Sequence, residues 1–203
     1  MKKYAVLYEP GDIVTLAGTR FVVLDVERRG SLPDSLFLLA LESVGTSEFG
    51  SSNNYAESDL KKAVDKWLED MDKRGLDNAK LIPREIDLTT LDGSGCYGKL
   101  SVKAAPLTLD EAREYADIIP NAERWCWLAT GWSGPSKSDG GLALYVLSSG
   151  DWSGSFCSYS RGIRPALKAP SILFEDSEAG LDLSKIPTDD LLQEIHRRLA
   201  EKA

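Results

Sequence analysis

Short apolar runs separated by polar residues and glycine fill much of the first fifty positions, a pattern that predicts β-strands. The segment GDIVTLAGTRFVVLDVE (11–27) holds two β-rich runs on either side of Ala17-Gly18-Thr19, which is typical of a hairpin turn. A third run, SLFLLALES (35–43), is almost continuously apolar, as expected of a central strand. We therefore expect the chain to open with a hairpin followed by a buried strand.

The hydrophobic period changes to that of a helix over residues 53–75, NNYAESDLKKAVDKWLEDMDKRG. One helical face carries the apolar residues Leu60, Ala63, Val64, Trp67, Leu68 and Met71. Asn54 is the expected N-cap, with Glu57 three residues later, and Gly75 is the expected stop. A second, shorter helix is predicted over TLDEAREYAD (108–117), with Thr108 as its cap.

The later part of the chain returns to strand-like composition, with runs at WCWLAT (125–130), ALYVLSSG (143–150) and GIRPALKA (162–169). Loops rich in glycine, serine and tryptophan separate these runs, at 131–141 and 148–161. The order of elements predicts an α+β fold with mixed or antiparallel sheets and two helices, followed by a helical tail.

We expect a domain over 1–168, an acidic linker over 169–187 and a C-terminal helix over 188–203. Thr188 is the expected cap of that helix. Its apolar stripe consists of Leu191, Leu192, Ile195 and Leu199. Such a stripe is expected to dock on the chain's own domain or on a partner.

Composition narrows the classes of function. The chain has 203 residues, 42% of them hydrophobic, which suits one domain with an appendage. A formal net charge of -8 argues against nucleic-acid binding, which needs a basic surface. We expect neither a signal peptide nor a membrane span. Cys96, Cys126 and Cys157, without C-x-x-C spacing, fit reduced thiols in a protein made in the cytoplasm.

The segment GSGCYGK (93–99) matches the glycine spacing of dinucleotide-binding loops, but its context does not fit. Such a site needs a strand before the glycines and a helix that opens at the last one. Here the chain continues as KLSVKAA (99–105), which alternates like a strand. The glycines therefore predict a turn.

Nucleophilic catalysis finds little support, because the only histidine, His196, lies among charged residues of the C-terminal helix. One histidine without C-x-x-C spacing gives no recognisable zinc site. Calcium near Asp139 or Asp151 stays open, although no D-x-D-x-D-G loop occurs. An acid–base pair of carboxylates also stays open, although no spacing points to one. We expect no catalytic residue, cofactor or bound metal.

The two polar loops have the chemistry of a recognition surface. Rigid aromatic rings give contact area at low entropic cost, and serine and glycine adapt their hydrogen bonds to a ligand. The candidate ligand-binding residues are Trp132, Ser133, Ser136, Ser138, Asp139, Trp152, Ser153, Ser155, Phe156, Ser158, Tyr159 and Ser160. The alternative is that the tryptophans pack inward and the serines only fill the loops.

Four stretches, in this order, resemble the C-type-lectin-fold domains of bacterial and phage proteins, in the branch related to formylglycine-generating enzymes. They are NNYAESDLKKAVDKWLE, PLTLDEAREY, WCWLATG and GIRPAL, within residues 12–168. The resemblance implies a platform of final strands with ligand-binding loops just before the closing strand. It assigns Trp127, Arg164 and Pro165 to the scaffold. The calcium-sugar motifs E-P-N and W-N-D are missing, so calcium-dependent sugar binding is not implied.

One subgroup of that branch consists of the variable proteins of diversity-generating retroelements, which are often phage-borne. There, adenine-directed mutagenesis randomises loop codons and leaves the frame intact. Residues 153–160 can all be encoded by codons ending in C or T, as that mutagenesis would give. The resemblance thus implies a non-enzymatic receptor-binding protein of a phage or prophage, with a protein or glycan on a bacterial surface as its ligand. About thirty-five residues follow the expected domain, which ends at residue 168, and this tail departs from the subgroup.

Two alternatives remain beside the binding protein. One is an oxidoreductase of the formylglycine-generating kind that uses Cys126 and Cys157. The other is a structural module of a phage particle. In either a binding protein or a module, the C-terminal helix would serve homo-oligomerisation or docking onto a virion.

Overall fold

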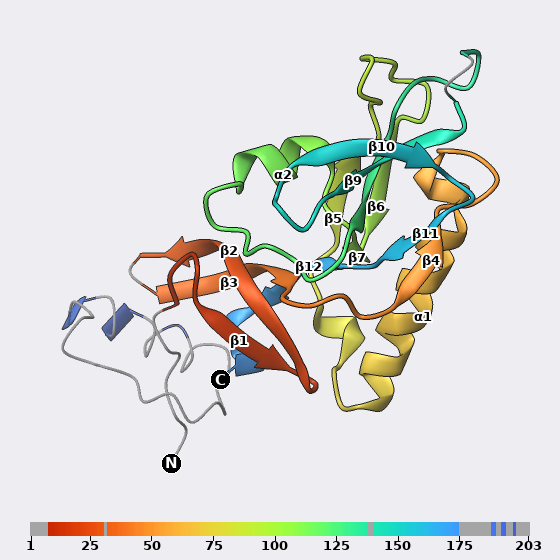
Figure 1. Ribbon diagram of the computed structural model, residues 1–203. Helices are drawn as coiled ribbons and strands as arrows, with labels where there is room; N and C mark the ends of the chain where they lie inside the picture. Colours follow the sequence, from red (N-terminus) through yellow and green to blue (C-terminus); the bar gives the residue numbers. More distant parts are fainter. Residues whose placement is uncertain are drawn as a thin grey trace.

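The computed structural model describes residues 8–30, 32–137 and 140–174, together with Thr188, Asp189, Leu192, Gln193 and Arg197. Residues 175–187 of the expected linker lie outside this part. So do Ser138, Asp139 and several residues of the expected C-terminal helix, namely Leu191, Ile195, His196 and Leu199. The described part folds into two five-stranded sheets, a separate hairpin and two α-helices, mostly with antiparallel pairing, which confirms the α+β class (Figure 1).

The first sheet joins the two ends of the described chain. Its strand order is β1 (Ile13–Leu16), β2 (Thr19–Arg29), β3 (Leu32–Ala40), β12 (Ala166–Pro170) and β7 (Ala104–Ala105), all antiparallel. The predicted hairpin turn is confirmed: Ala17 and Gly18 both have positive φ, at 46° and 76°, the backbone of a type I′ turn. β3 lies between β2 and β12, so the prediction of a central strand is confirmed as well.

The second sheet has the order β10 (Trp152–Phe156), β9 (Leu142–Val146), β8 (Cys126–Gly131), β11 (Ser160–Gly162) and β4 (Thr46–Glu48). β8 is buried at every position. The prediction of a continuous loop over 148–161 was wrong, because β10 pairs with β9 along its whole length. The predicted strand at 162–169 is divided between β11 and β12, because the chain crosses there from one sheet to the other.

Both predicted helices are present, each with a well-defined cap. α1 (Asp59–Lys73) begins one turn later than predicted, because Ser58 caps it, while Asn54 caps a separate 3₁₀ turn at Tyr55–Glu57. α2 (Leu109–Glu114) has the predicted cap Thr108, which forms a capping box with Glu111. α1 buries Leu60, Val64, Leu68 and Met71, whereas Ala63 and Trp67 are only partly covered.

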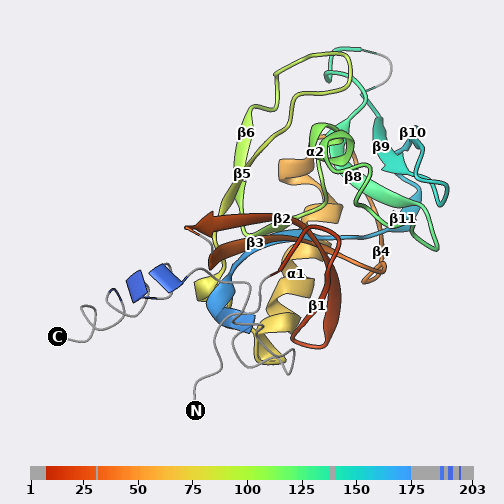
Figure 2. The same ribbon diagram turned by 90° about the vertical axis from the view of Figure 1, so that its left-hand side faces the viewer.

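The glycine-rich segment forms the turn of a hairpin, as predicted. β5 (Arg84–Asp87) and β6 (Lys99–Val102) pair antiparallel on either side of it. Figure 2 shows this hairpin projecting away from the sheets beside α2. An ion pair between Arg84 of β5 and Glu111 of α2 joins the two elements. No helix within the described residues is long and apolar enough to cross a bilayer.

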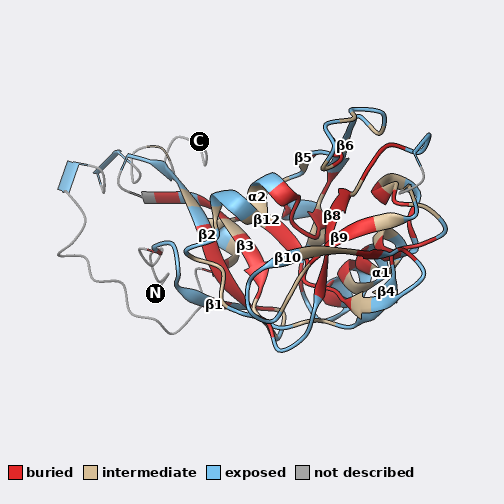
Figure 3. Cartoon of the chain, turned by 45° about the horizontal axis from the view of Figure 1, so that its top comes forward, coloured by how far each residue is buried: buried red, intermediate tan, exposed pale blue. Residues whose placement is uncertain are grey.

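The main core lies between the sheets and α1, and a smaller core lies under α2. Figure 3 shows the buried residues concentrated along the strands of both sheets. Trp127 is buried in the main core, with its ring edge-on to Phe49 at 5.5 Å. The packed unit continues past the predicted boundary at residue 168, since Phe174 is buried and meets the ring of Tyr8 at 5.7 Å.

The position of the α1 cap is open to a direct test. Ser58 accepts a hydrogen bond from the Lys61 N–H at 2.9 Å, so Ser58→Ala should lower the free energy of unfolding by about 1 kcal/mol in urea denaturation. Ser51→Ala is the matched control, because Ser51 is exposed and lies outside the helix. An equal effect of the two substitutions would contradict the assignment of Ser58 as the cap.

Candidate recognition surface

The candidate ligand-binding residues are not all at the surface. The exposed ones are Ser136, Trp152, Phe156, Ser158, Tyr159 and Ser160. Ser133 and Ser155 are buried, and Trp132 and Ser153 are half-buried. Ser138 and Asp139 lie outside the described residues. The expected scaffold residues Trp127, Arg164 and Pro165 are all buried.

The two candidate loops lie against each other. Gly154 of β10 faces the ring of Trp132, and a Cβ at Gly154 would come within 2.5 Å of that ring. The Cys157 N–H donates to the Gly141 carbonyl at 2.8 Å. Part of the Trp132 ring is thus covered by a contact inside the protein, and the side chain is half-buried. Because Gly154 has no side chain, the Trp132 ring can pack directly on the backbone of β10.

The loop that follows β8 is also held from its other side. Lys137 donates a hydrogen bond to Asp92, in the turn of the β5–β6 hairpin, at 2.6 Å. This bond, with a second one from the Thr90 hydroxyl, holds the pKa of the Asp92 carboxyl well below its usual range. Gly134 packs closely on Ser94 of the same turn. The loop is therefore anchored to the hairpin and to β10.

Three exposed aromatic side chains gather at one end of the second sheet. Trp125, Phe156 and Tyr159 are 43%, 59% and 52% exposed. The rings of Phe156 and Tyr159 meet edge to face at 5.8 Å, and Trp125 stacks on the buried Tyr145 at 5.4 Å. We call the group Trp125, Phe156, Tyr159 and Arg161 the aromatic surface.

The guanidinium of Arg161 lies against three aromatic rings. Its central carbon lies 5.2 Å from the ring centres of both Trp125 and Tyr145 and 5.5 Å from that of Tyr159. These distances are within the range of cation–π attraction. Its Nη2 also donates to the Ser155 hydroxyl oxygen at 3.0 Å. Arg161 is therefore held in place from several sides before any ligand arrives.

Strand pairing explains why these residues meet. β11 runs parallel to β8, with Gly162 opposite Cys126, so Arg161 and Trp125 lie on the same side of the sheet. Tyr159 is two residues before Arg161 and shares that side. A depression of about 390 Å³ lies next to them, between Trp125, Arg161 and the exposed Glu123 and Arg124.

Sequence reasoning missed Trp125, Tyr145 and Arg161. The first two were read only as strand residues, and Arg161 as the end of a loop. The alternation W-C-W at 125–127 was an available signal, since it places Trp125 on the same face as Trp127. Only Trp127 lies deep enough in the sheet to be buried, so the first residue of the run remains partly open to solvent.

Arg164 and Pro165 lie where the chain crosses between the sheets. The Arg164 Nε donates to the Ala40 carbonyl at 2.9 Å, and its Nη1 donates to the Pro120 carbonyl at 3.1 Å. The Pro165 carbonyl accepts from the Ala40 N–H at 2.9 Å. The crossing is thus fastened to the end of β3 and to the segment before β8.

The two cysteines of the oxidoreductase alternative are both buried. Burial raises the pKa of the Cys126 thiol to about 11 and that of the Cys157 thiol to about 12. Cys126 donates to the Arg124 carbonyl at 3.3 Å, and its sulfur lies close to Gly162. Cys157 belongs to the main core. Within the described residues, no group of three histidine, cysteine, aspartate or glutamate side chains is placed to hold a metal ion.

Alkylation tests these thiols directly. Iodoacetamide reacts with thiolates, so at pH 8 the folded protein should take up one label, at the exposed Cys96. Cys126 and Cys157 should react only after denaturation, because their raised pKa values keep them protonated. Mass spectrometry of the peptides distinguishes the three sites. Rapid labelling of Cys126 or Cys157 in the folded protein would instead favour a reactive thiol centre.

No protein-family model, no curated protein and no solved structure matches the chain. The geometry of the aromatic surface and the chemistry of its side chains are therefore the basis for inferring function.

Proposed function

We propose that the chain is a ligand-binding protein that recognises its partner through the aromatic surface. The observation that carries the proposal is the convergence of two exposed rings, Trp125 and Tyr159, on one held guanidinium, with the exposed Phe156 packed edge to face on Tyr159. Tryptophan, tyrosine and arginine are the residues that dominate the energetics of protein interfaces. The aromatic rings of tryptophan and tyrosine also suit stacking on a sugar. The ligand we propose is a protein or glycan on a bacterial surface.

The arrangement favours binding because little of it has to be ordered on contact. Arg161 is fixed by rings and by Ser155, and Trp125 rests on the buried Tyr145. Immobilising a free side chain at an interface costs about 0.5–1.5 kcal/mol. Side chains that are already held avoid much of this cost. Ser158 and Ser160, both exposed next to Tyr159, add adaptable hydrogen-bonding groups.

A C-type-lectin-like fold is part of the proposal. Two features support it: the first and last strands of the domain belong to one sheet, and a second sheet carries the exposed turns. We further propose that the protein is a variable protein of a diversity-generating retroelement in a phage or prophage. The residues between 152 and 160 include both exposed and covered positions, which would let the exposed ones vary without disturbing the frame.

The aromatic surface is tested by removing its rings. Labelled wild-type protein should be retained by cells of at least one strain in a bacterial panel, or by a glycan on an array. Tyr159→Ala or Trp125→Ala should weaken that binding about 30-fold, the cost of losing a hot-spot side chain. Titration on the retaining cells or glycan measures the change.

Ile13→Ala is the matched control, because Ile13 is an equally exposed apolar residue on β1, in the other sheet. It should bind like the wild type. Equal retention of all variants, or no retention of the wild type by any cell or glycan, would contradict the proposal.

The variable-protein version makes a separate prediction about sequence. Copies from one habitat should differ at the exposed Phe156, Ser158 and Tyr159 and agree at Gly154 and Cys157, where packing leaves no freedom. The neighbouring DNA should hold a reverse transcriptase gene and a near-duplicate of the segment. Sequencing such copies measures both, and equal variation at exposed and covered positions would defeat this version.

A further inference from the structure

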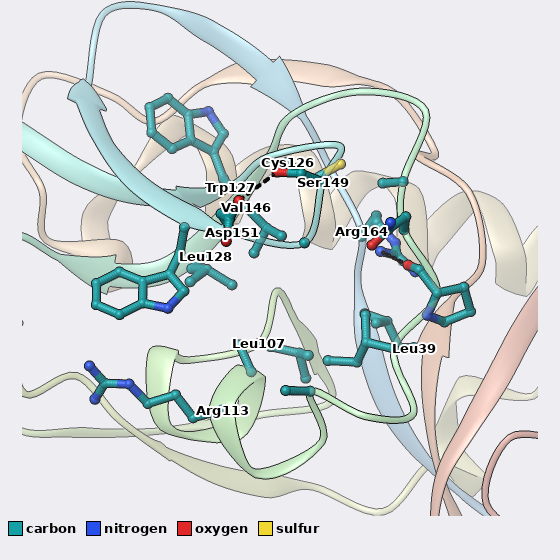
Figure 4. A pocket seen from close by; sticks show the side chains of 18 residues that line it. Leu39, Leu107, Arg113, Cys126, Trp127, Leu128, Val146, Ser149, Asp151 and Arg164 are labelled. Carbon is teal, nitrogen blue, oxygen red and sulfur yellow. Dashed lines mark hydrogen bonds between the residues drawn. The ribbon is translucent and has the colours of Figure 1, made fainter.

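A cavity of about 430 Å³ lies between α2 and the second sheet. Its volume is within the range of small-molecule sites. Figure 4 shows the residues that line it, with the side chains of Leu39, Leu107, Leu128 and Val146 forming apolar walls. Trp125, Phe156 and Tyr159 do not line it, so the cavity is distinct from the aromatic surface.

Arg164 lies in the wall of this cavity as a buried cation. The residue is only 6% exposed, and its Nε and Nη1 donate to two carbonyls. Among the described residues, its Nη2 has no hydrogen-bond partner and no carboxylate lies within ion-pair distance of it, although the charge of Glu42, which pairs with Arg20, acts on it from farther away. Burial lowers the pKa of its guanidinium, because the charged form is desolvated. Carbonyl groups stabilise the cation but do not neutralise it.

The opposite side of the cavity offers an aromatic ring on which an apolar group can pack. The indole of Trp152 is partly exposed there, and the Arg113 guanidinium lies over it at 4.9 Å from the ring centre. Figure 4 shows Arg113 and Arg164 on different sides of the cavity, with apolar side chains between them. The lining also contains one carboxylate, that of Asp151, whose Oδ2 accepts from the Ser149 hydroxyl at 2.9 Å.

We propose that this cavity binds a small carboxylate with an aromatic body. The carboxylate lies at the Arg164 end, where it supplies the direct ion pair and the Nη2 partner that the described residues do not. The aromatic body lies along the apolar walls toward Trp152. A buried arginine without a partner charge is costly, and a carboxylate is the planar anion that its guanidinium matches in geometry. The walls then take up the rest of the ligand by hydrophobic burial.

The probe for this site is 3-phenylpropanoate, with 3-phenylpropanamide as its uncharged counterpart. By titration calorimetry at neutral pH, the acid should bind about tenfold or more tightly than the amide, because only the acid forms a charge-assisted bond to Arg164. In two-dimensional NMR, the acid should shift the Gly150 amide and the Trp152 indole signals. Both residues line the cavity.

Location is tested by filling the cavity. Ala116 lines it and is exposed just after α2, so Ala116→Trp should reduce the affinity for the acid about tenfold while the fold is retained. Ala116→Ser is the matched control and should bind like the wild type. Arg164→Lys, which keeps the charge but loses the planar fork, should bind the acid more weakly.

Three outcomes would overturn the proposal. They are equal affinity for acid and amide, unchanged binding of the acid to Ala116→Trp, and absence of both heat and NMR shifts with the acid. The NMR mapping on the wild type keeps the test decisive even where Arg164→Lys fails to fold. The Ala116 variants change only the cavity, so a failure of this proposal can be distinguished from a failure of the proposed recognition through the aromatic surface.

Discussion

The fold depends on a buried cation at the point where the chain passes between its two sheets. Arg164 binds the carbonyls of Ala40 and Pro120, and thereby fastens the crossing segment to the end of β3 and to the approach to β8. Removing such a group would leave two buried carbonyls without donors, each costing about 1–3 kcal/mol. Arg164 itself lines the cavity, and Arg161 of the aromatic surface precedes it by three residues. The geometry of both candidate sites is therefore set by the same few hydrogen bonds.

The second sheet serves two different surfaces through the simple alternation of its side chains. Cys126, Val146 and Trp152 lie opposite one another across three strands and line the cavity. Tyr145, the residue before Val146 on β9, points to the other face, where it stacks under Trp125 of the aromatic surface. A shift of one residue in the pairing would exchange the two faces. Register is thus what keeps the recognition surface and the cavity apart.

Local chemistry made much of the fold predictable. The turn at Ala17 and Gly18 and the cap at Thr108 are local signals, and the structure confirms both. The start of α1 was placed a turn too early because Asn54 and Ser58 are both good caps, and each caps a helical segment of its own. These choices involve neighbours within one or two turns of the chain, so the sequence carries most of the information.

The candidate site was harder to predict because it depends on contacts between distant residues. β10 has the composition of a loop, and it becomes a strand because β9 offers it a full set of backbone partners. Arg161 meets Trp125 only because β11 pairs in parallel with β8 at one position. No pattern within a window of the sequence encodes that pairing. Exposure could be anticipated for Phe156 and Tyr159, but not the burial of Ser133 and Ser155.

The contact between Trp132 and Gly154 has a consequence for the speed at which a complex would come apart. Because the indole presses on bare backbone, β10 is braced independently of which side chains occupy the following turn. A turn that is already rigid loses little conformational entropy on binding. It also does not have to unfold locally before or during dissociation. This contact would therefore lower the rate of dissociation from a partner more than it would raise the rate of association.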